Sequence, residues 1–282
     1  MRDRGRIYVR HDDRARLGRQ YRDVRVIESP RGRVRTVFNA GPRRVVAVRD
    51  PGGRLLYKYR YAPGGRRVVL IDNRPLYAVG AAIIFAGALA AIAAPRITIP
   101  RERYIVDYRL ASYDDVYDTL RAPPVSRIER RYSLDEVLHR RNVRDYVRRI
   151  DLDEITFASG SWDLEPSQFA RLDRIARAMK AVLDSDPDQV FLIEGHTDAV
   201  GSDEDNLSLS DRRAETIAEI LTEEYGIPPE NLVTQGYGES DLKIDTELPE
   251  RLNRRVAVRN ITALLARGDV DQDDYDDDRR TR

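Results

Sequence analysis

The stretch that decides the fold of the C-terminal part of the chain is "EGHTDAVGSDEDNLSLSDRRAETIAEIL", residues 194–221. A glycine-flanked loop carries Asp198, and Arg213 follows fifteen positions later on an amphipathic helix. Arg213 is four residues from both Leu209 and Ile217, so it lies on or beside the apolar stripe of that helix. A guanidinium in this place needs a partner. Two explanations remain open: an internal salt bridge to Asp198, or a pair of groups that binds the ammonium and the carboxylate of one ligand.

The sequence around this stretch predicts a small α+β domain over residues 151–265. The expected elements, in order, are a strand over 152–161, a helix that starts at Pro166, a strand in "QVFLIEGH", a helix over 204–225, a strand in "YGIPPENLVTQGYGE" and a final strand in "NRRVAVRNI". This β-α-β-α-β-β order packs two helices on one face of a mixed sheet. After it, residues 266–282 are expected to be a disordered acidic tail.

The N-terminal part of the chain is strongly basic, although the formal charge of the whole chain is only +1. Short apolar-alternating runs over residues 24–75 are separated by turn sequences such as "DPGG" and "APGG", which predicts a small Arg-rich β-meander. Residues 1–23 are expected to be a disordered basic segment. They lack the apolar core of a secretory signal, so we expect either that a signal has been removed or that targeting is internal.

A charge-free stretch, "LYAVGAAIIFAGALAAIAA", occupies residues 76–94. Its nineteen residues match the length of a membrane-spanning helix, so it is a candidate transmembrane helix; a buried helix or hairpin is the alternative. The basic residues around it weakly favour a cytoplasmic N-terminal side, with the C-terminal half outside. Small residues four positions apart in this stretch are compatible with a homo-oligomer, but they are also common by chance in an Ala-rich helix. Residues 95–150 are expected to form a linker with short helices.

Three separated blocks, "EGHTDAVGSDEDNLSLSDRRA", "TQGYGES" and "NRRVAV", resemble the peptidoglycan-binding OmpA-like domain family, whose members include outer membrane protein A, Pal and MotB. The resemblance covers roughly residues 152–262. It implies that Asp198 and Arg213 clasp the free end of diaminopimelate in peptidoglycan stem peptides. It also implies that Thr197, Gly201 and Asn206 shape the loop of the site.

The resemblance assigns the last block of the motif as well. Arg255 is expected to line the same cleft as the clasp, whereas Asn253 and Arg254 are expected to cap and brace the last strand. The sequence departs from the family at Ala158, where many members carry Asp or Asn, and in a shortened segment over 240–252. These departures concern the rim of the site.

The expected function is therefore non-catalytic attachment of a membrane to peptidoglycan in the cell envelope, with the C-terminal domain in the periplasm. The outer membrane is favoured by the resemblance, and the inner membrane if residues 76–94 span. The alternative is an OmpA-like fold used as a protein-interaction module, with the basic region binding an anionic polymer or nucleic acid. The interpretation that Arg only solubilises weak strands is favoured over both of these partners, and nucleic acid is not expected as a partner.

Two other classes of function are weighed against this expectation. An enzyme or metal site would have to use the alternating Glu194, His196 and Asp198, but the chain has no cysteine and no other histidine in the domain. An ion-driven stator would need an ionisable group within residues 76–94, and the stretch has none. We therefore expect no catalysis, no metal and no cofactor.

Overall fold

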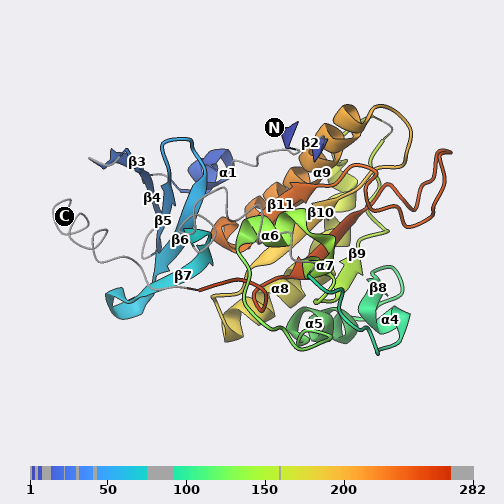
Figure 1. The fold of residues 1–282 in the computed structure, drawn as a ribbon, viewed down its shortest axis with the longest axis horizontal. Coiled ribbons are helices and arrows are strands. Elements are labelled where there is room, and N and C mark those ends of the chain that lie inside the picture. The colour runs from blue at the N-terminus through green and yellow to red at the C-terminus, as the bar shows by residue number, and fades with distance from the viewer. Residues whose placement is uncertain are drawn as a thin grey trace. The chain divides into compact units, whose positions relative to one another are not determined.

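The computed structural model describes residues 2–3, 6–7, 14–21, 23–29, 32–40, 43–74, 92–158 and 160–267. The chain forms two compact units, and each takes residues from three separate stretches. Unit 1 contains Met1–Gln20, Pro95–Ile128 and Asp145–Ala263, and unit 2 contains Tyr21–Ala94, Glu129–Arg144 and Leu264–Arg282. Helices and sheets occur in both units (Figure 1), which confirms the expected α+β class.

The sheet of unit 1 has five strands in the order β11-β10-β12-β9-β8. Their bounds are Ile105–Asp107 for β8, Arg149–Asp151 for β9, Phe191–Gly195 for β10, Leu232–Gly236 for β11 and Val256–Asn260 for β12. The pairs β10–β11 and β8–β9 are parallel, whereas β12 is antiparallel to both β10 and β9. Phe191 and Ile193 lie in the apolar core, so by the alternation of a strand Glu194 is on the opposite face of the sheet.

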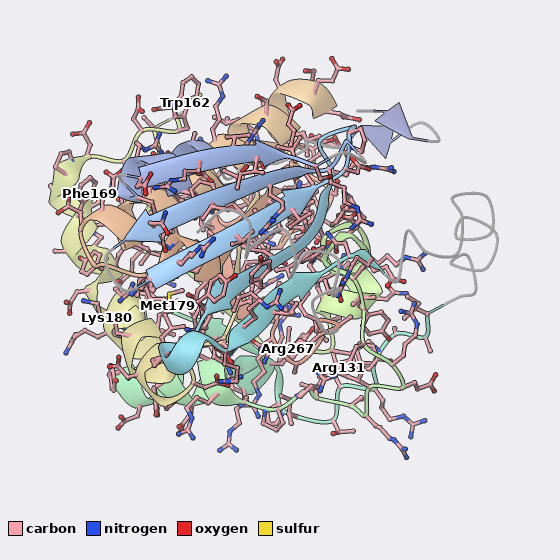
Figure 2. The ribbon with its side chains drawn as sticks, turned by 90° about the vertical axis from the view of Figure 1, so that its left-hand side faces the viewer. Arg131, Trp162, Phe169, Met179, Lys180 and Arg267 are labelled. Carbon is pink, nitrogen blue, oxygen red and sulfur yellow. The ribbon has the colours of Figure 1, made fainter. Side chains whose placement is uncertain are left out.

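Two long helices accompany this sheet, as expected from the sequence. Pro166–Leu172 form a 3₁₀ turn, η2, that leads into α8 (Asp173–Ser185), and α9 spans Asp203–Glu223. α9 packs against β10 and β11. On α8 the neighbours Met179 and Lys180 are buried and exposed respectively, in keeping with its amphipathic pattern (Figure 2). Shorter elements of the unit are β1 (Arg2–Asp3), β2 (Arg6–Ile7), α1 (Arg14–Gln20), α4 (Arg101–Tyr104) and the 3₁₀ turn η3 (Pro229–Asn231).

The first strand of this domain lies earlier than the sequence pattern predicts. The expected strand over 152–161 is wrong, because the ladder with β12 belongs to β9 at Arg149–Asp151. Leu152 still donates its N–H to Val256 O at 2.8 Å, but the N–H of Ile155 then turns back to Leu152 O at 3.0 Å. The described residues that follow, up to Ala158, contain no strand. The turn therefore releases this segment from the sheet and lets it run toward α9.

Residues 95–150 are more than the expected linker. β8 pairs with β9, and α5 (Tyr113–Arg121) packs against α8. Val116 and Leu120 of α5 belong to the same apolar core as α8 and α9. Ser112 starts α5 with a capping box, in which Asp115 N–H donates to the Ser112 hydroxyl at 3.1 Å. The described part of the segment thus contributes a strand and a helix to the domain itself.

The sheet of unit 2 is the antiparallel meander that the sequence predicts. Its strands follow chain order, with β3 at Asp23–Glu28, β4 at Val34–Ala40, β5 at Arg43–Arg49, β6 at Leu55–Tyr61 and β7 at Arg67–Asp72. Pro63–Gly65 form a 3₁₀ turn, η1, between the last two strands. Val46, Val48, Tyr57 and Tyr59 pack together as a small apolar core on one face of the Arg-rich sheet.

Asn73, at the end of β7, ties the meander to the short helices of the same unit. Its side chain donates to Leu55 O at 3.0 Å, and its amide oxygen accepts the N–H of Leu134 at 2.7 Å. Leu134 begins α6 (Leu134–His139), and α7 (Arg141–Arg144) follows. Asn73 is buried, so both contacts are shielded from water.

The expected terminal and apolar segments fall largely outside the described residues. Residues 76–91 of the candidate transmembrane helix and 268–282 of the acidic tail lie there. No helix in the described ranges has the length and apolar character needed to cross a membrane. The expectation of disorder over 1–23 is wrong for Arg14–Gln20, which form α1 with Arg16 and Leu17 buried.

Candidate functional site

The loop between β10 and α9 holds Asp198 in place through backbone contacts. The N–H of His196 donates to Arg255 O, and the N–H of Thr197 donates to Gly238 O, both at 2.9 Å. Farther along the loop, Gly201 has a φ of +111°, a conformation that favours glycine. Ser202 then caps α9 by accepting the N–H of Asp205 at 3.1 Å. The loop therefore cannot move freely relative to the strands beneath it.

Asp198 binds Arg254, a contact that the sequence does not predict. Arg254 Nη1 lies 2.5 Å from Asp198 Oδ2. The Asp198 side chain is 10% exposed and that of Arg254 is 32% exposed, so the pair lies at the surface end of the site. Arg254 was expected to brace the last strand. Instead it is the cation nearest to the predicted clasp carboxylate.

Arg213 is buried on α9 and its guanidinium is held by backbone carbonyls. Nε donates to Ser161 O at 2.9 Å and Nη2 to Ala158 O at 3.2 Å. The guanidinium carbon is 5.0 Å from the ring centroid of Phe157. In the part of the chain that the structure describes, the buried Nη1 has no hydrogen-bond partner. The two N–H groups on Nη1 therefore lack an acceptor among the described residues.

Electrostatic interactions connect Arg213 with the Asp198–Arg254 pair. Burial, together with the positive charge of Arg254, lowers the pKa of Arg213 to about 10, while Asp198 opposes this shift. Even so, Arg213 stays protonated at neutral pH. Among the described residues, Asp198 and Arg213 form no ion pair with each other. The Asp198–Arg213 salt bridge, one of the two explanations that the sequence left open, is therefore not formed among the described residues. The two groups interact only electrostatically, without direct contact.

The three loop residues predicted to shape the site lie in or beside this loop. Thr197 is buried, and its hydroxyl has no partner among the described residues. The side-chain amide of Asn206 donates to Glu239 Oε2 at 2.8 Å. A Cβ added at Gly201 would be 3.7 Å from Asn206 Oδ1. Asn206 thus links the start of α9 to the loop that follows β11.

Arg255, which the resemblance implies to line the same cleft, is buried and contacts groups other than Asp198 and Arg213. Its guanidinium donates to Asp241 O at 2.8 Å, and its Nε is 3.9 Å from Asp151 Oδ1. Burial and the charge of Arg149 lower the pKa of Arg255 to about 10. Arg255 therefore belongs to a buried charge network beneath the loop, and the neighbouring Arg254 reaches the site instead.

The side chain of Asn253 holds the segment after β11 in place. A related structural role, in which Asn253 caps and braces the last strand, was expected from the sequence. Its side-chain oxygen accepts the N–H groups of Lys243 and Ile244 at 2.7 and 2.9 Å, and its amide donates to Ile244 O at 2.8 Å. The shortened segment over 240–252 is thereby fixed to the residue next to Arg254. In the sequence, the only sign of this bracing role is the asparagine that precedes two arginines.

The segment before η2, which includes Ser161 and Trp162, packs against α9 next to Arg213. Trp162, labelled in Figure 2, lies against Arg212, with 4.2 Å between the guanidinium carbon and the ring centroid. Thr216 donates its hydroxyl to Trp162 O at 2.9 Å. The segment that supplies the carbonyls for Arg213 is therefore attached to α9 at two further points.

Glu194, His196 and Asp198 alternate around the end of β10 but bind different main partners, although His196 Nε2 lies 3.9 Å from Glu194 Oε2. Glu194 binds Arg259, with Nε–Oε distances of 3.1 and 3.2 Å, while Asp198 binds Arg254. His196 is buried and stacks on Tyr237 at a centroid distance of 5.7 Å. Over the described ranges no three His, Cys, Asp or Glu side chains are grouped as metal ligands.

Comparison with known proteins places this site in a family. Residues 156–255 match the model of the OmpA family, and this part of the chain is thus an OmpA family domain. Outer membrane porin F of Pseudomonas aeruginosa is 35% identical over 112 residues, which cover 39% of this chain and 31% of that protein. The peptidoglycan-binding protein ArfA of Mycobacterium tuberculosis is 32% identical over 106 residues, which cover 37% of this chain and 31% of that protein.

Among solved structures, the peptidoglycan-associated lipoprotein from Burkholderia pseudomallei is 26% identical. The match covers 37% of this chain and 86% of that chain, with a TM-score of 0.32. The chain thus spans about a third of the length of the two curated relatives above. Residues 156–255, which match the family model, include Asp198, Arg213 and Arg254.

Proposed function

We propose that this protein is a non-catalytic component of the cell envelope that attaches a membrane to peptidoglycan. In this proposal the OmpA family domain binds the free end of diaminopimelate in stem peptides. Asp198 receives the ammonium group and Arg213 receives the carboxylate. Two relatives are named as a peptidoglycan-binding protein and an outer membrane porin, and these names support a location in the cell envelope for this chain.

The observation that carries the proposal is the unused donor of Arg213 beside Asp198. A buried guanidinium N–H without an acceptor is costly, and a ligand carboxylate would supply that acceptor. Asp198 binds Arg254 through Oδ2, which leaves its other oxygen as an acceptor for an ammonium group. A carboxylate and a guanidinium side by side thus match a zwitterionic end.

A single site of this kind is expected to bind weakly. Each charge-assisted hydrogen bond contributes about 1.5–3 kcal/mol net. Peptidoglycan repeats the same stem peptide many times, so several copies of the protein on one membrane would hold the polymer by avidity. Durable attachment therefore does not require tight binding at each site.

Co-sedimentation with purified diaminopimelate-type sacculi tests the proposal. The full chain should sediment with the sacculi, and Asp198→Ala and Arg213→Ala should each abolish this binding. Arg177→Ala is a matched control, because Arg177 is an exposed arginine on α8 that pairs with Asp173 at 2.8 Å. Normal sedimentation of either clasp variant would show that the assignment is wrong.

Loss of the fold must be separated from loss of binding, because Arg213 is buried. The chain has one tryptophan, Trp162, and its fluorescence therefore reports on the OmpA family domain alone. Arg213→Lys keeps a charge but cannot offer the planar pair of donors. A folded Arg213→Lys variant that fails to bind supports the clasp, whereas one that binds normally contradicts it.

A further inference from the structure

The candidate site contains one more positive charge than the clasp requires. The carboxylate of Asp198 binds the guanidinium of Arg254 directly and interacts electrostatically with that of Arg213. The group closest to Asp198 is Arg254, at 2.5 Å, so the charge of Asp198 is already balanced before a ligand arrives. The remaining charge of Arg213 is unbalanced within this group of three.

Because of this excess positive charge, the carboxylate of a zwitterionic ligand should contribute more to binding than its ammonium group. Arg213 has a buried Nη1 without an acceptor among the described residues. An ionised carboxylate would fill that position and place a negative charge next to the guanidinium of Arg213. A carboxamide would leave the charge unbalanced, and its NH₂ group would face other donors.

We propose that Arg254 is a specificity-determining residue, which makes the site select a ligand end with an ionised carboxylate over the corresponding carboxamide. This inference rests on the proposed function and deepens it, because it names the form of diaminopimelate that is bound. Stem peptides whose free diaminopimelate carboxyl group is amidated are poor ligands. Arg254 acts by keeping Asp198 paired, so that the site as a whole remains cationic.

Titration of the full chain with two synthetic stem peptides tests this selectivity. One peptide carries diaminopimelate with its free carboxylate, and the other carries the carboxamide at the same position. Trp162 fluorescence or calorimetry gives both dissociation constants. The unmodified chain should bind the carboxamide peptide about tenfold or more weakly, because a charge-assisted bond is replaced by a neutral one.

The variant Arg254→Gln should reduce this ratio toward one, and Arg254→Lys should retain part of it. Arg251→Gln is the matched control, because it removes an exposed arginine from the same loop. An equal loss of affinity for both peptides in Arg254→Gln, with the ratio unchanged, would make Arg254 a purely structural residue and overturn the proposal. Failure of the unmodified chain to bind either peptide would instead contradict the proposed function itself.

A second inference concerns the membrane and rests on different contacts. Residues before and after the stretch 75–91 meet within each unit. In unit 1, Arg16 of α1 donates to Leu232 O at 3.2 Å and lies 3.7 Å from Glu215 of α9. In unit 2, Asn73 accepts the N–H of Leu134 at 2.7 Å.

Neither contact can form across a bilayer, whose hydrocarbon core is about 30 Å thick. We infer that the described residues up to 74 and those from 92 onward lie on the same side of any membrane that the protein contacts. The basic meander then shares a compartment with the OmpA family domain. The arrangement with a cytoplasmic N-terminal side and an external C-terminal half is incompatible with these contacts.

Labelling of single cysteines tests this topology, because the chain has no cysteine of its own. Val26→Cys in β3 and Leu110→Cys after β8 place thiols at positions that are 64% and 80% exposed. A membrane-impermeant maleimide should label both variants in spheroplasts, or neither until the membrane is permeabilised. Labelling of only one of them in intact spheroplasts would overturn the inference.

Discussion

Arg213 illustrates how far a single residue can be understood from sequence alone. Its place on the apolar stripe of a helix predicts that something must satisfy its guanidinium, and the OmpA resemblance predicts its neighbour Asp198. The structure supplies what neither could give: two backbone carbonyls, from Ala158 and Ser161, hold the guanidinium. These contacts depend on the path of an irregular segment, which leaves no periodic signal in the sequence.

The exchange of roles between Arg254 and Arg255 has a similar cause. Successive residues that lead into a strand point to opposite sides, so a shift of one position sends a different side chain into the site. Arg255 turns toward Asp241 and Asp151, and Arg254 reaches Asp198. The sequence motif identifies the pair of arginines but not which of them contacts Asp198.

His196 gives a pH-dependent prediction at the residue scale. Burial, together with the positive charge of Arg255, lowers its pKa from 6.5 to about 4, although Glu194 partly opposes this shift. Between these two pH values the unfolded chain binds more protons at this residue than the folded chain, so stability falls as the pH falls. We expect His196 to account for up to about 3 kcal/mol of this loss.

Urea unfolding followed by Trp162 fluorescence, at several pH values from 7 to 4, measures this effect. The variant His196→Gln cannot titrate, so its stability should depend less on pH than that of the unmodified chain. Carboxylates that titrate in the same range affect both proteins, and the difference between them isolates His196. Identical pH profiles would show that His196 does not contribute.

At the scale of elements, the packing of α9 against β10 depends on the absence of a side chain at Gly195. A Cβ at this position would lie 1.9 Å from Ser210 O, which belongs to the backbone of α9. Gly195→Ala should therefore destabilise the domain by about 1–3 kcal/mol or more. The measurement is urea unfolding followed by Trp162 fluorescence.

Gly18→Ala provides the control for this substitution. Gly18 lies in α1, and a Cβ there would meet nothing within 4 Å. Since alanine favours a helix, this variant should be more stable by about 0.5–1 kcal/mol. Equal effects of the two substitutions would contradict the close approach of α9 to β10.

β8 and α5, which the sequence does not assign to the domain, are short. β8 has three residues and α5 has nine, so neither gives enough repeats for a clear periodic pattern. The prolines nearby, at 95, 100, 123 and 124, also resemble those of an ordinary linker. By contrast, α8 and α9 extend over several turns, and their patterns predict them well.

Tyr108 provides a test that the segment after β8 belongs to the domain. Its hydroxyl donates to Arg171 O and accepts the N–H of Ile175, both at 2.9 Å, at the start of α8. Burial raises its pKa to about 12. Tyr108→Phe leaves the Ile175 N–H without its acceptor, so we expect a loss of about 1–3 kcal/mol in the free energy of unfolding.

The matched control for this prediction is Tyr113→Phe. Among the described residues Tyr113 stacks on Tyr117 at a centroid distance of 6.1 Å, and that contact does not need its hydroxyl. This variant should unfold like the unmodified chain. A stable Tyr108→Phe variant would mean that the segment contributes little to the domain.

At the scale of the whole molecule, the N-terminal helix α1 belongs to unit 1 and packs against α9 of the OmpA family domain despite its distance in sequence. Besides the contacts of Arg16, Arg19 of α1 forms ion pairs with Glu219 and Glu223 of α9. Removal of residues 1–20 should therefore lower the stability of this domain by about 1–3 kcal/mol, mostly through loss of the buried Arg16 hydrogen bond.

Trp162 fluorescence in urea measures this change, because the reporter is remote from the deletion in sequence. A shorter deletion, of residues 1–13, leaves α1 intact and should have a much smaller effect. If both deletions changed the midpoint equally, α1 would not be the stabilising element.

The alternation of the two units along the sequence has a consequence for recombination between genes. Each unit takes three stretches that alternate along the sequence, so no single cut separates one unit from the other. A genetic crossover at any one point would carry over an incomplete unit. The two units are therefore expected to pass together between genes as complete units, although residues 156–255, which match the OmpA family, lie within one continuous stretch of unit 1.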